Sequence, residues 1–132
     1  MTARFAAIGL VATDMARTLA FYRRLGLDLP PEADDAPHAE AELPGGLRLM
    51  FDTLAMVQSI DPSWTSSSGG QTSSLAFECD SPADVDATYA ELTGAGDEGH
   101  LAPWDAEWGQ RYAVVHDPDG RGVDLFAPLA TD

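Results

Sequence analysis

The stretch from Trp108 to Phe126, WGQRYAVVHDPDGRGVDLF, decides how the rest of the chain is interpreted. Two runs rich in β-branched and aromatic residues flank Asp117-Pro118-Asp119-Gly120. Proline presets a turn dihedral and glycine tolerates positive φ, so the stretch predicts a β-hairpin. Asp124 then lies within the second strand, with its carboxylate opposite to both neighbouring side chains. It faces either solvent or a polar cavity, and the function depends on which.

Length and charge narrow the class of protein. A chain of 132 residues, 45% of them hydrophobic, is expected to form one globular domain. The 22 acidic residues outnumber the 7 basic ones and give a formal charge of -15, which disfavours nucleic acid and anionic lipid as partners. The acidity would attract a cationic ligand, but a generally acidic soluble protein shows the same balance and is the preferred explanation of the charge.

Cysteine content and hydropathy point to the cytoplasm. The single Cys79 excludes an intrachain disulfide, and its apolar neighbours predict a buried, unreactive thiol. No apolar stretch approaches the roughly 20 residues that span a membrane, and the N-terminus lacks the apolar core of a signal peptide. We therefore expect a cytoplasmic protein.

The order of predicted elements repeats once along the chain. Residues 1–52 predict a first module, with strands at 5–11, 27–29, 38–43 and 47–51 and a helix that begins after Asp14. Residues 53–71 show no stable period and are rich in Ser and Gly, which predicts a flexible connector. Residues 72–132 predict a second module, with a strand at 73–79, a helix from 82 to 92, a strand at 98–104 and the hairpin.

The two modules also match residue by residue. A shift of 67 positions places Ala7 on Ser74 and Tyr22 on Tyr89, with the helices in phase. We interpret this match as an internal duplication. The predicted fold class is therefore α+β, a single domain of two βαβββ modules.

Three features of the sequence resemble the vicinal oxygen chelate superfamily, which comprises glyoxalase I, extradiol dioxygenases, fosfomycin-resistance transferases and bleomycin-resistance binding proteins. They are the repeated module, the helix start DMARTLAFY at 14–22, and Trp108-Gly109-x-Arg111-Tyr112 before the Asp-Pro-Asp-Gly turn. The resemblance implies curled mixed sheets with helices outside, a cleft inside and, commonly, a homodimer.

The resemblance also implies where metal ligands would lie, in the first and last strand of each module. Family enzymes usually have His or Glu there. The corresponding positions in this chain are Ala7, Met50, Ser74 and Asp124. Alanine has no donor, methionine offers a soft thioether and neutral serine is a poor ligand.

Other residues do not replace the missing ligands. Asp52 shares the face of Met50 but adds only one carboxylate, and His38, His100 and His116 match none of these positions. We therefore expect no metal and no cofactor.

Each curled sheet is expected to form a cup around the cleft. Because side chains alternate between the two faces of a strand, the sequence predicts which residues line this cup in place of metal ligands. The inward set includes small residues, apolar Met50 and Phe126, and three acids, with Arg48 expected to pair with an acid. Aromatic residues are expected around the rim, where they suit a flat organic ligand. The candidate ligand-binding residues are Met50, Asp52, Trp64, Ser74, Trp104, Trp108, Tyr112, Asp124 and Phe126.

These features predict a metal-free protein that binds a small planar or cationic aromatic compound, such as an antibiotic, and sequesters it without catalysis. Two alternatives stay open. One is a lyase, isomerase or dioxygenase of the same superfamily with a displaced or absent metal site. The other is a homodimer whose cup is filled by side chains.

Overall fold

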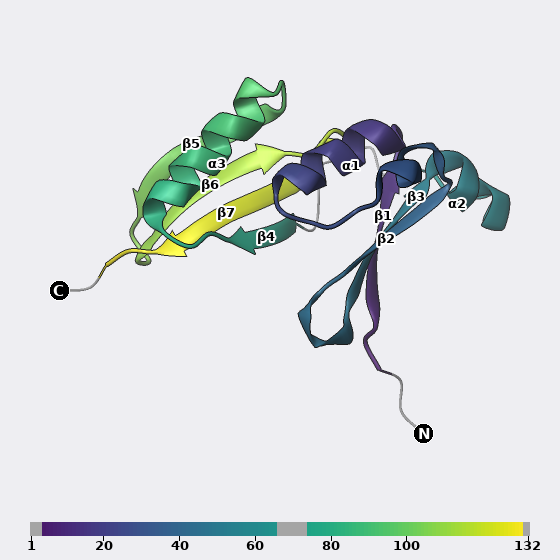
Figure 1. Cartoon of the computed structure of the whole chain (residues 1–132), viewed down its shortest axis with the longest axis horizontal. Helices are drawn as coiled ribbons and strands as arrows, with labels where there is room; N and C mark the ends of the chain where they lie inside the picture. The colour runs from purple at the N-terminus through teal and green to yellow at the C-terminus, as the bar shows by residue number, and fades with distance from the viewer. Residues whose placement is uncertain (1–3, 66–73, 131–132) are drawn as a thin grey trace. The chain divides into compact units, whose positions relative to one another are not determined.

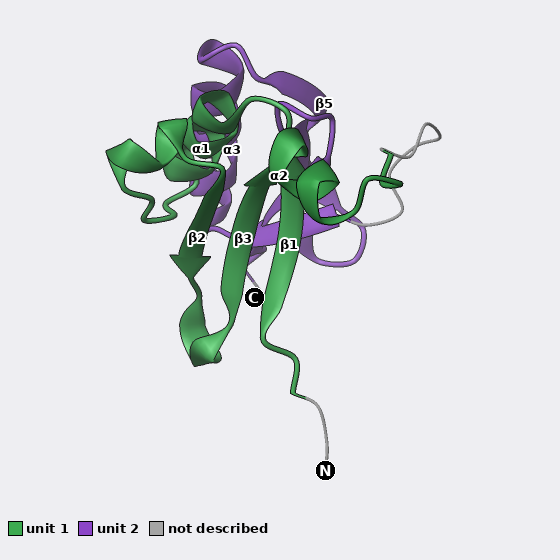
Figure 2. Cartoon of the chain, turned by 90° about the vertical axis from the view of Figure 1, so that its right-hand side faces the viewer, with its two compact units in different colours: residues 1–68 green, residues 69–132 purple. Residues whose placement is uncertain are grey.

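The chain folds into two compact units, residues 1–68 and 69–132 (Figure 2). The computed structural model describes residues 4–65 and 74–130. Unit 1 comprises β1 (Ala7–Ala12), α1 (Met15–Arg24), η1 (Pro31–Asp35), β2 (His38–Glu42), η2 (Pro44–Gly46), β3 (Arg48–Thr53) and α2 (Leu54–Ile60). Unit 2 comprises β4 (Ser74–Glu78), α3 (Pro82–Gly94), β5 (Glu98–Ala106), β6 (Gln110–His116) and β7 (Gly122–Pro128).

Each unit contains one mixed, unclosed sheet. The sheet of unit 1 has the strand order β1-β3-β2, with β1 parallel and β2 antiparallel to β3 (Figure 2). The sheet of unit 2 has the order β4-β7-β6-β5, with β4 parallel to β7 and the other pairs antiparallel. The predicted α+β class is confirmed, and so is the hairpin, as β6 and β7.

The core of unit 2 lies between its sheet and α3, which runs along one face of the sheet (Figure 1). Alternate residues of β6 and β7 point to this helix, as the period of two requires, and those from Ala113 to Val115 and from Val123 to Ala127 are buried. We call the opposite face, which points away from α3, the far face of unit 2. The buried set is Val85, Leu92, Ala113, Val115, Val123, Leu125 and Ala127.

Unit 1 is built in the same way. Asp14 caps α1, because its side chain accepts a hydrogen bond from the Arg17 amide at 3.1 Å. The buried Tyr22 ring of α1 lies 5.2 Å from the Phe51 ring of β3, centroid to centroid. The far face of unit 1, opposite these buried residues, carries Met50, Asp52, His38 and Glu40.

The predicted strand at 27–29 is wrong, and the described part of unit 1, residues 4–65, forms a sheet of three strands instead of four. Arg23 explains the difference. Its guanidinium donates to the carbonyl oxygens of Leu29 at 2.9 Å and Pro30 at 2.7 Å, and to Asp34 at 2.8 Å. These bonds tie the segment to the end of α1 and use carbonyl groups that a strand would offer to its neighbour.

The segment after β3 is also more regular than the sequence indicated. Residues 54–60 form α2, although we expected a connector without regular structure. Thr53 caps this helix by accepting a hydrogen bond from the Met56 amide at 3.1 Å, and local capping needs no hydrophobic period. Residues 66–71 of the connector lie outside the described residues.

The shift of 67 positions holds for the first two elements of each unit. β1 begins at Ala7 and β4 at Ser74, while α1 begins at Met15 and α3 at Pro82. No helix among the described residues is both long and apolar enough to cross a lipid bilayer.

Candidate ligand-binding face of unit 2

Four aromatic side chains form a cluster on the far face of unit 2. The Tyr112 ring centroid lies 5.6 Å from that of Trp104, 5.3 Å from Trp108 and 6.4 Å from Phe126. The two tryptophan rings lie 6.1 Å apart, edge to face. These distances fall in the favourable range for aromatic pairs, so the rings support one another.

The register of the sheet builds this aromatic cluster. Trp104 of β5 lies opposite Tyr112 of β6, which lies opposite Phe126 of β7. Residues directly opposite in antiparallel strands share a face, so the three rings form one row. Trp108 reaches this row from the β5–β6 turn, where its Nε1 donates to the Gln110 Oε1 at 2.8 Å. It is 57% exposed and offers its ring to a partner.

Asp124 lies beside the aromatic cluster and accepts a hydrogen bond from the Tyr112 hydroxyl. Its Cα partner is Val114, two residues along each strand from the Tyr112–Phe126 pair. Burial, followed by the hydrogen bond and charge of Asp124, raises the pKa of Tyr112 to about 12. The hydroxyl therefore stays protonated near neutral pH and orients the carboxylate.

The rest of the far face is small or acidic. Glu78 of β4 lies opposite Phe126, Ala76 lies opposite Asp124, and Ser74 lies opposite Gly122. Glu78, Ala76 and Ser74 are exposed. The face therefore combines aromatic rings, short side chains that leave space, and two carboxylates from neighbouring strands.

The hairpin turn positions β6 and β7. The buried Asp117 carboxylate accepts hydrogen bonds from the amides of Asp119 and Arg121, both at 2.9 Å, and pairs with the Arg121 guanidinium. Gly120 has φ of 83°, which a side chain would disfavour. These contacts fix the turn and with it the register of the two strands.

Comparison with known proteins agrees with this architecture. The model of the Glyoxalase/Bleomycin resistance protein/Dioxygenase superfamily matches residues 4–125. The chain belongs to this superfamily. No curated protein matches the sequence at a significant level.

Solved structures of this superfamily resemble the chain over nearly its whole length. A glyoxalase/bleomycin resistance protein/dioxygenase from Nocardioides is 25% identical, with a TM-score of 0.73 over 100% of this chain and 87% of that chain. A family enzyme from Burkholderia phytofirmans PsJN is 19% identical, with a TM-score of 0.81 over 96% and 100%. Lactoylglutathione lyase from Agrobacterium tumefaciens is 18% identical, with a TM-score of 0.65 over 96% and 94%. The last two show the fold alone.

The four positions at which the resemblance predicts metal ligands carry side chains that do not suit a divalent cation. The Ala7 side chain has no donor atom, Met50 offers a thioether, and exposed Ser74 a neutral hydroxyl. Asp124, the remaining carboxylate, is engaged by Tyr112. Within residues 4–65 and 74–130, no group of three or more His, Cys, Asp or Glu side chains is arranged to hold a metal ion.

The structure brings together five of the nine predicted site residues of this superfamily member: Trp104, Trp108, Tyr112, Asp124 and Phe126. Ser74 lies further along the same far face. The other three belong to unit 1, where Met50 and Asp52 lie on β3 and half-buried Trp64 follows α2.

The far face of unit 1 carries a charged network that was not predicted from the sequence. His38 Nδ1 lies 2.5 Å from Asp52 Oδ1, and His38 Nε2 lies 3.3 Å from Glu40 Oε2. The hydrogen bond to Asp52 raises the pKa of His38, partly opposed by burial. Arg48, expected to pair with Asp52, Glu78 or Asp124, instead contacts both Glu40 carboxylate oxygens at 2.9 Å. Polar and small residues alternate in His38-Ala39-Glu40, and the next strand along the chain carries Arg48 and Asp52. This pattern could have predicted a charged network across the two strands.

The other two histidines that the sequence analysis considered as metal ligands, and the single cysteine, have ordinary structural surroundings. The rings of His100 and His116 stack at 4.7 Å, and His116 Nδ1 lies 2.7 Å from Glu98 Oε1. Cys79 is half-buried, not fully buried as expected, and burial raises the pKa of its thiol. A raised thiol pKa lowers the thiolate fraction, which fits the expected low reactivity.

Proposed function

We propose that this superfamily member binds a planar aromatic small molecule, such as an antibiotic, on the far face of unit 2 and sequesters it without a metal. The single observation that carries the proposal is the aromatic cluster of Trp104, Trp108, Tyr112 and Phe126 beside Asp124. A flat ligand would stack on the exposed Trp108 ring and cover the row behind it. Ser74 would border the same ligand.

Stacking is expected to supply most of the affinity. An aromatic pair contributes about 0.5–1.5 kcal/mol beyond the area that it buries. The neighbouring acids Asp124 and Glu78 would favour a ligand with a cationic or N–H donor group at its edge. The formal charge of -15 would speed the encounter with such a cation.

The absence of a suitable donor set supports binding rather than metal chemistry. Family positions that hold His or Glu in the enzymes hold Ala7, Met50 and Ser74 here. Asp124 then serves as a hydrogen-bond acceptor for the ligand through the carboxylate oxygen that Tyr112 leaves unoccupied.

A calorimetric screen tests this proposal. The purified chain is titrated with planar aromatic compounds, cationic and neutral, with metal analysis of the same sample. We expect at least one cationic compound to bind, Trp108→Ala to weaken its binding by roughly tenfold, and Phe5→Ala to leave it unchanged. Phe5 is a matched control because it is an aromatic residue of unit 1 with 69% exposure. Binding that needs a stoichiometric divalent metal, or that survives Trp108→Ala, would overturn the proposal.

A further inference from the structure

We propose that the outer edge of β2 in unit 1 binds an extended basic peptide segment of another protein by strand addition. This site is separate from the aromatic cluster of unit 2. Four observations lead to it: the register of β2, the missing fourth strand, a cavity at this edge, and the local charge.

The register shows which backbone groups point outward. β2 is an edge strand, since the sheet order is β1-β3-β2. The Thr53 amide donates to the Pro37 carbonyl at 3.0 Å, and the Leu43 amide donates to the Leu47 carbonyl at 2.8 Å. Hydrogen-bonded pairs alternate along an antiparallel ladder, so Ala39 and Ala41 bond to β3. The N–H and C=O groups of His38, Glu40 and Glu42 therefore point away from the sheet.

These outward groups have no backbone partner among the described residues. In unit 2 the equivalent edge of β6 is covered by β5. Within residues 4–65, unit 1 has no fourth strand, because Arg23 holds the carbonyls of Leu29 and Pro30 at the end of α1. The duplication thus leaves one strand position vacant, next to three unpaired donors and three unpaired acceptors.

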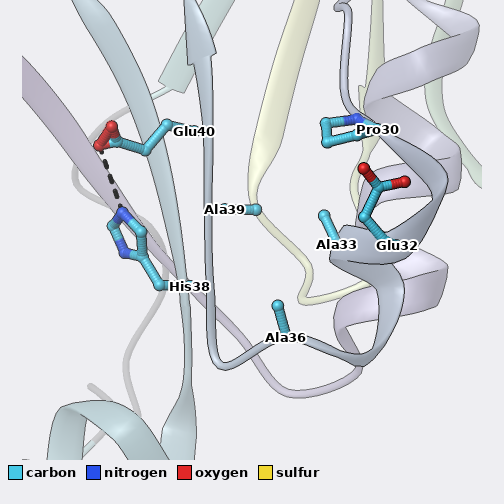
Figure 3. Close-up of a pocket in the computed structure, with 7 residues that line it drawn as sticks. All are labelled: Pro30, Glu32, Ala33, Ala36, His38, Ala39 and Glu40. Atoms are coloured by element: carbon cyan, nitrogen blue, oxygen red, sulfur yellow. Dashed lines mark ion pairs between the residues drawn. The ribbon is translucent and has the colours of Figure 1, made fainter.

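A cavity of about 350 Å³ lies at this vacant position. Figure 3 shows Ala33, Ala36 and Ala39 turned toward it, while the His38 and Glu40 side chains point to the other side of β2. The β2 backbone therefore forms one wall, and Pro30 and the residues of η1 form the other. Such a slot accepts a main chain better than a bulky ring, because its apolar wall is made of small side chains.

The carboxylates around the edge of β2 favour a peptide strand with basic side chains. Side chains of an added strand would alternate between the small apolar wall and the far face, where Glu40 and Glu42 lie. Glu32 at the cavity mouth and Glu42 form no ion pair within the described residues. Lysine or arginine on the far face would therefore meet Glu42 and Glu40, the latter already paired with Arg48, and a basic side chain on the cavity side would meet Glu32. An acidic strand would be repelled by the same carboxylates.

The test is an NMR titration of the ¹⁵N-labelled full chain with acetyl-Lys-Ala-Lys-Ala-Lys-amide. We expect saturable shifts of the Glu40 and Glu42 amides and slower hydrogen exchange there. The matched acetyl-Glu-Ala-Glu-Ala-Glu-amide should not bind. A basic peptide methylated on alternate amide nitrogens should lose at least tenfold in affinity, and this comparison needs no variant of the protein.

Two variants separate backbone from charge. Glu40→Pro removes an outward N–H, a substitution that edge strands accommodate, and should weaken binding at least tenfold with the fold retained by circular dichroism. Glu40→Gln keeps the N–H and should weaken binding only a few fold. The proposal is overturned by no binding at ~1 mM peptide, by full binding of the methylated peptide, by shifts confined to the far face of unit 2, or by concentration-dependent pairing of two chains through this edge.

Discussion

The Tyr112 hydroxyl donates a hydrogen bond to the Asp124 carboxylate across the neighbouring strands β6 and β7. Tyr112 also contacts the rings of Trp104, Trp108 and Phe126. One side chain therefore joins the aromatic cluster to its acid. The arrangement fixes an acceptor next to an apolar surface, which is what recognition of a flat, edge-polar ligand requires.

The first prediction concerns the ionisation of Tyr112. Its pKa of about 12 lies above the ordinary value of about 10. Folding stability from this group is thus fully present below about pH 10 and is lost as the pH rises from there through the folded pKa. With ¹³Cζ-labelled tyrosine, the Tyr112 signal should remain that of a phenol at pH 10.5. Asp124→Asn should lower this pKa without restoring the ordinary value, because burial is the larger cause. An ordinary pKa in the wild-type chain would contradict the geometry.

The second prediction concerns the pH response of His38. Because its folded-state pKa is raised, chiefly by Asp52, the stabilisation it gives is complete below about pH 6.5 and disappears as the pH rises through the folded pKa. NMR titration of the imidazole Cε1 proton should give a pKa above 6.5, and Asp52→Asn should lower it. If Asp52→Asn leaves the His38 titration unchanged, the network on this face is not formed in solution.

The third prediction concerns the contact between α3 and β5. A Cβ atom at Gly99 would lie 2.1 Å from the Tyr89 hydroxyl oxygen and 2.7 Å from its Cζ. Gly99→Ala should therefore lower the free energy of unfolding by about 1–3 kcal/mol, measured with urea. Gly94→Ala is the matched control, since a Cβ there meets nothing within 4 Å. Equal effects of both substitutions would show that the close approach is absent.

The fourth prediction concerns the hairpin turn. Asp117→Ala removes the acceptor of two backbone amides and the partner of Arg121, so it should cost about 1–3 kcal/mol of unfolding free energy. Asp117→Asn can keep an oxygen for the two amides and should cost less. A larger loss in the asparagine variant than in the alanine variant would show that the backbone contacts are unimportant.

Period and turn chemistry were enough to predict the far face of unit 2 from the sequence. Alternation places Asp124 and Phe126 on the side opposite Val123, Leu125 and the helix, and the Asp-Pro-Asp-Gly turn fixes the hairpin. The hydrogen bond between Tyr112 and Asp124 could not be predicted from the sequence. Tyr112 lies opposite Phe126 and Asp124 lies opposite Val114, so the two are diagonal neighbours, and strand pattern and turn type do not specify a contact between diagonal side chains.

The secondary structure of unit 1 differs from the prediction at two segments, because single side chains there override the local sequence pattern. Arg23 binds backbone carbonyls of the segment expected to be a strand, and Thr53 caps a helix in the segment expected to be irregular. The His38–Asp52 pair was missed for another reason. Its members are 14 positions apart and become neighbours only through the β2–β3 register.

The most direct test of the central claim is a set of intermolecular nuclear Overhauser effects between the chain and the tightest compound of the calorimetric screen. We predict contacts from the ligand to the ring protons of Trp104, Trp108 and Tyr112, with the compound unchanged after prolonged incubation. Contacts that avoid these rings, or conversion of the compound into a product, would contradict the account.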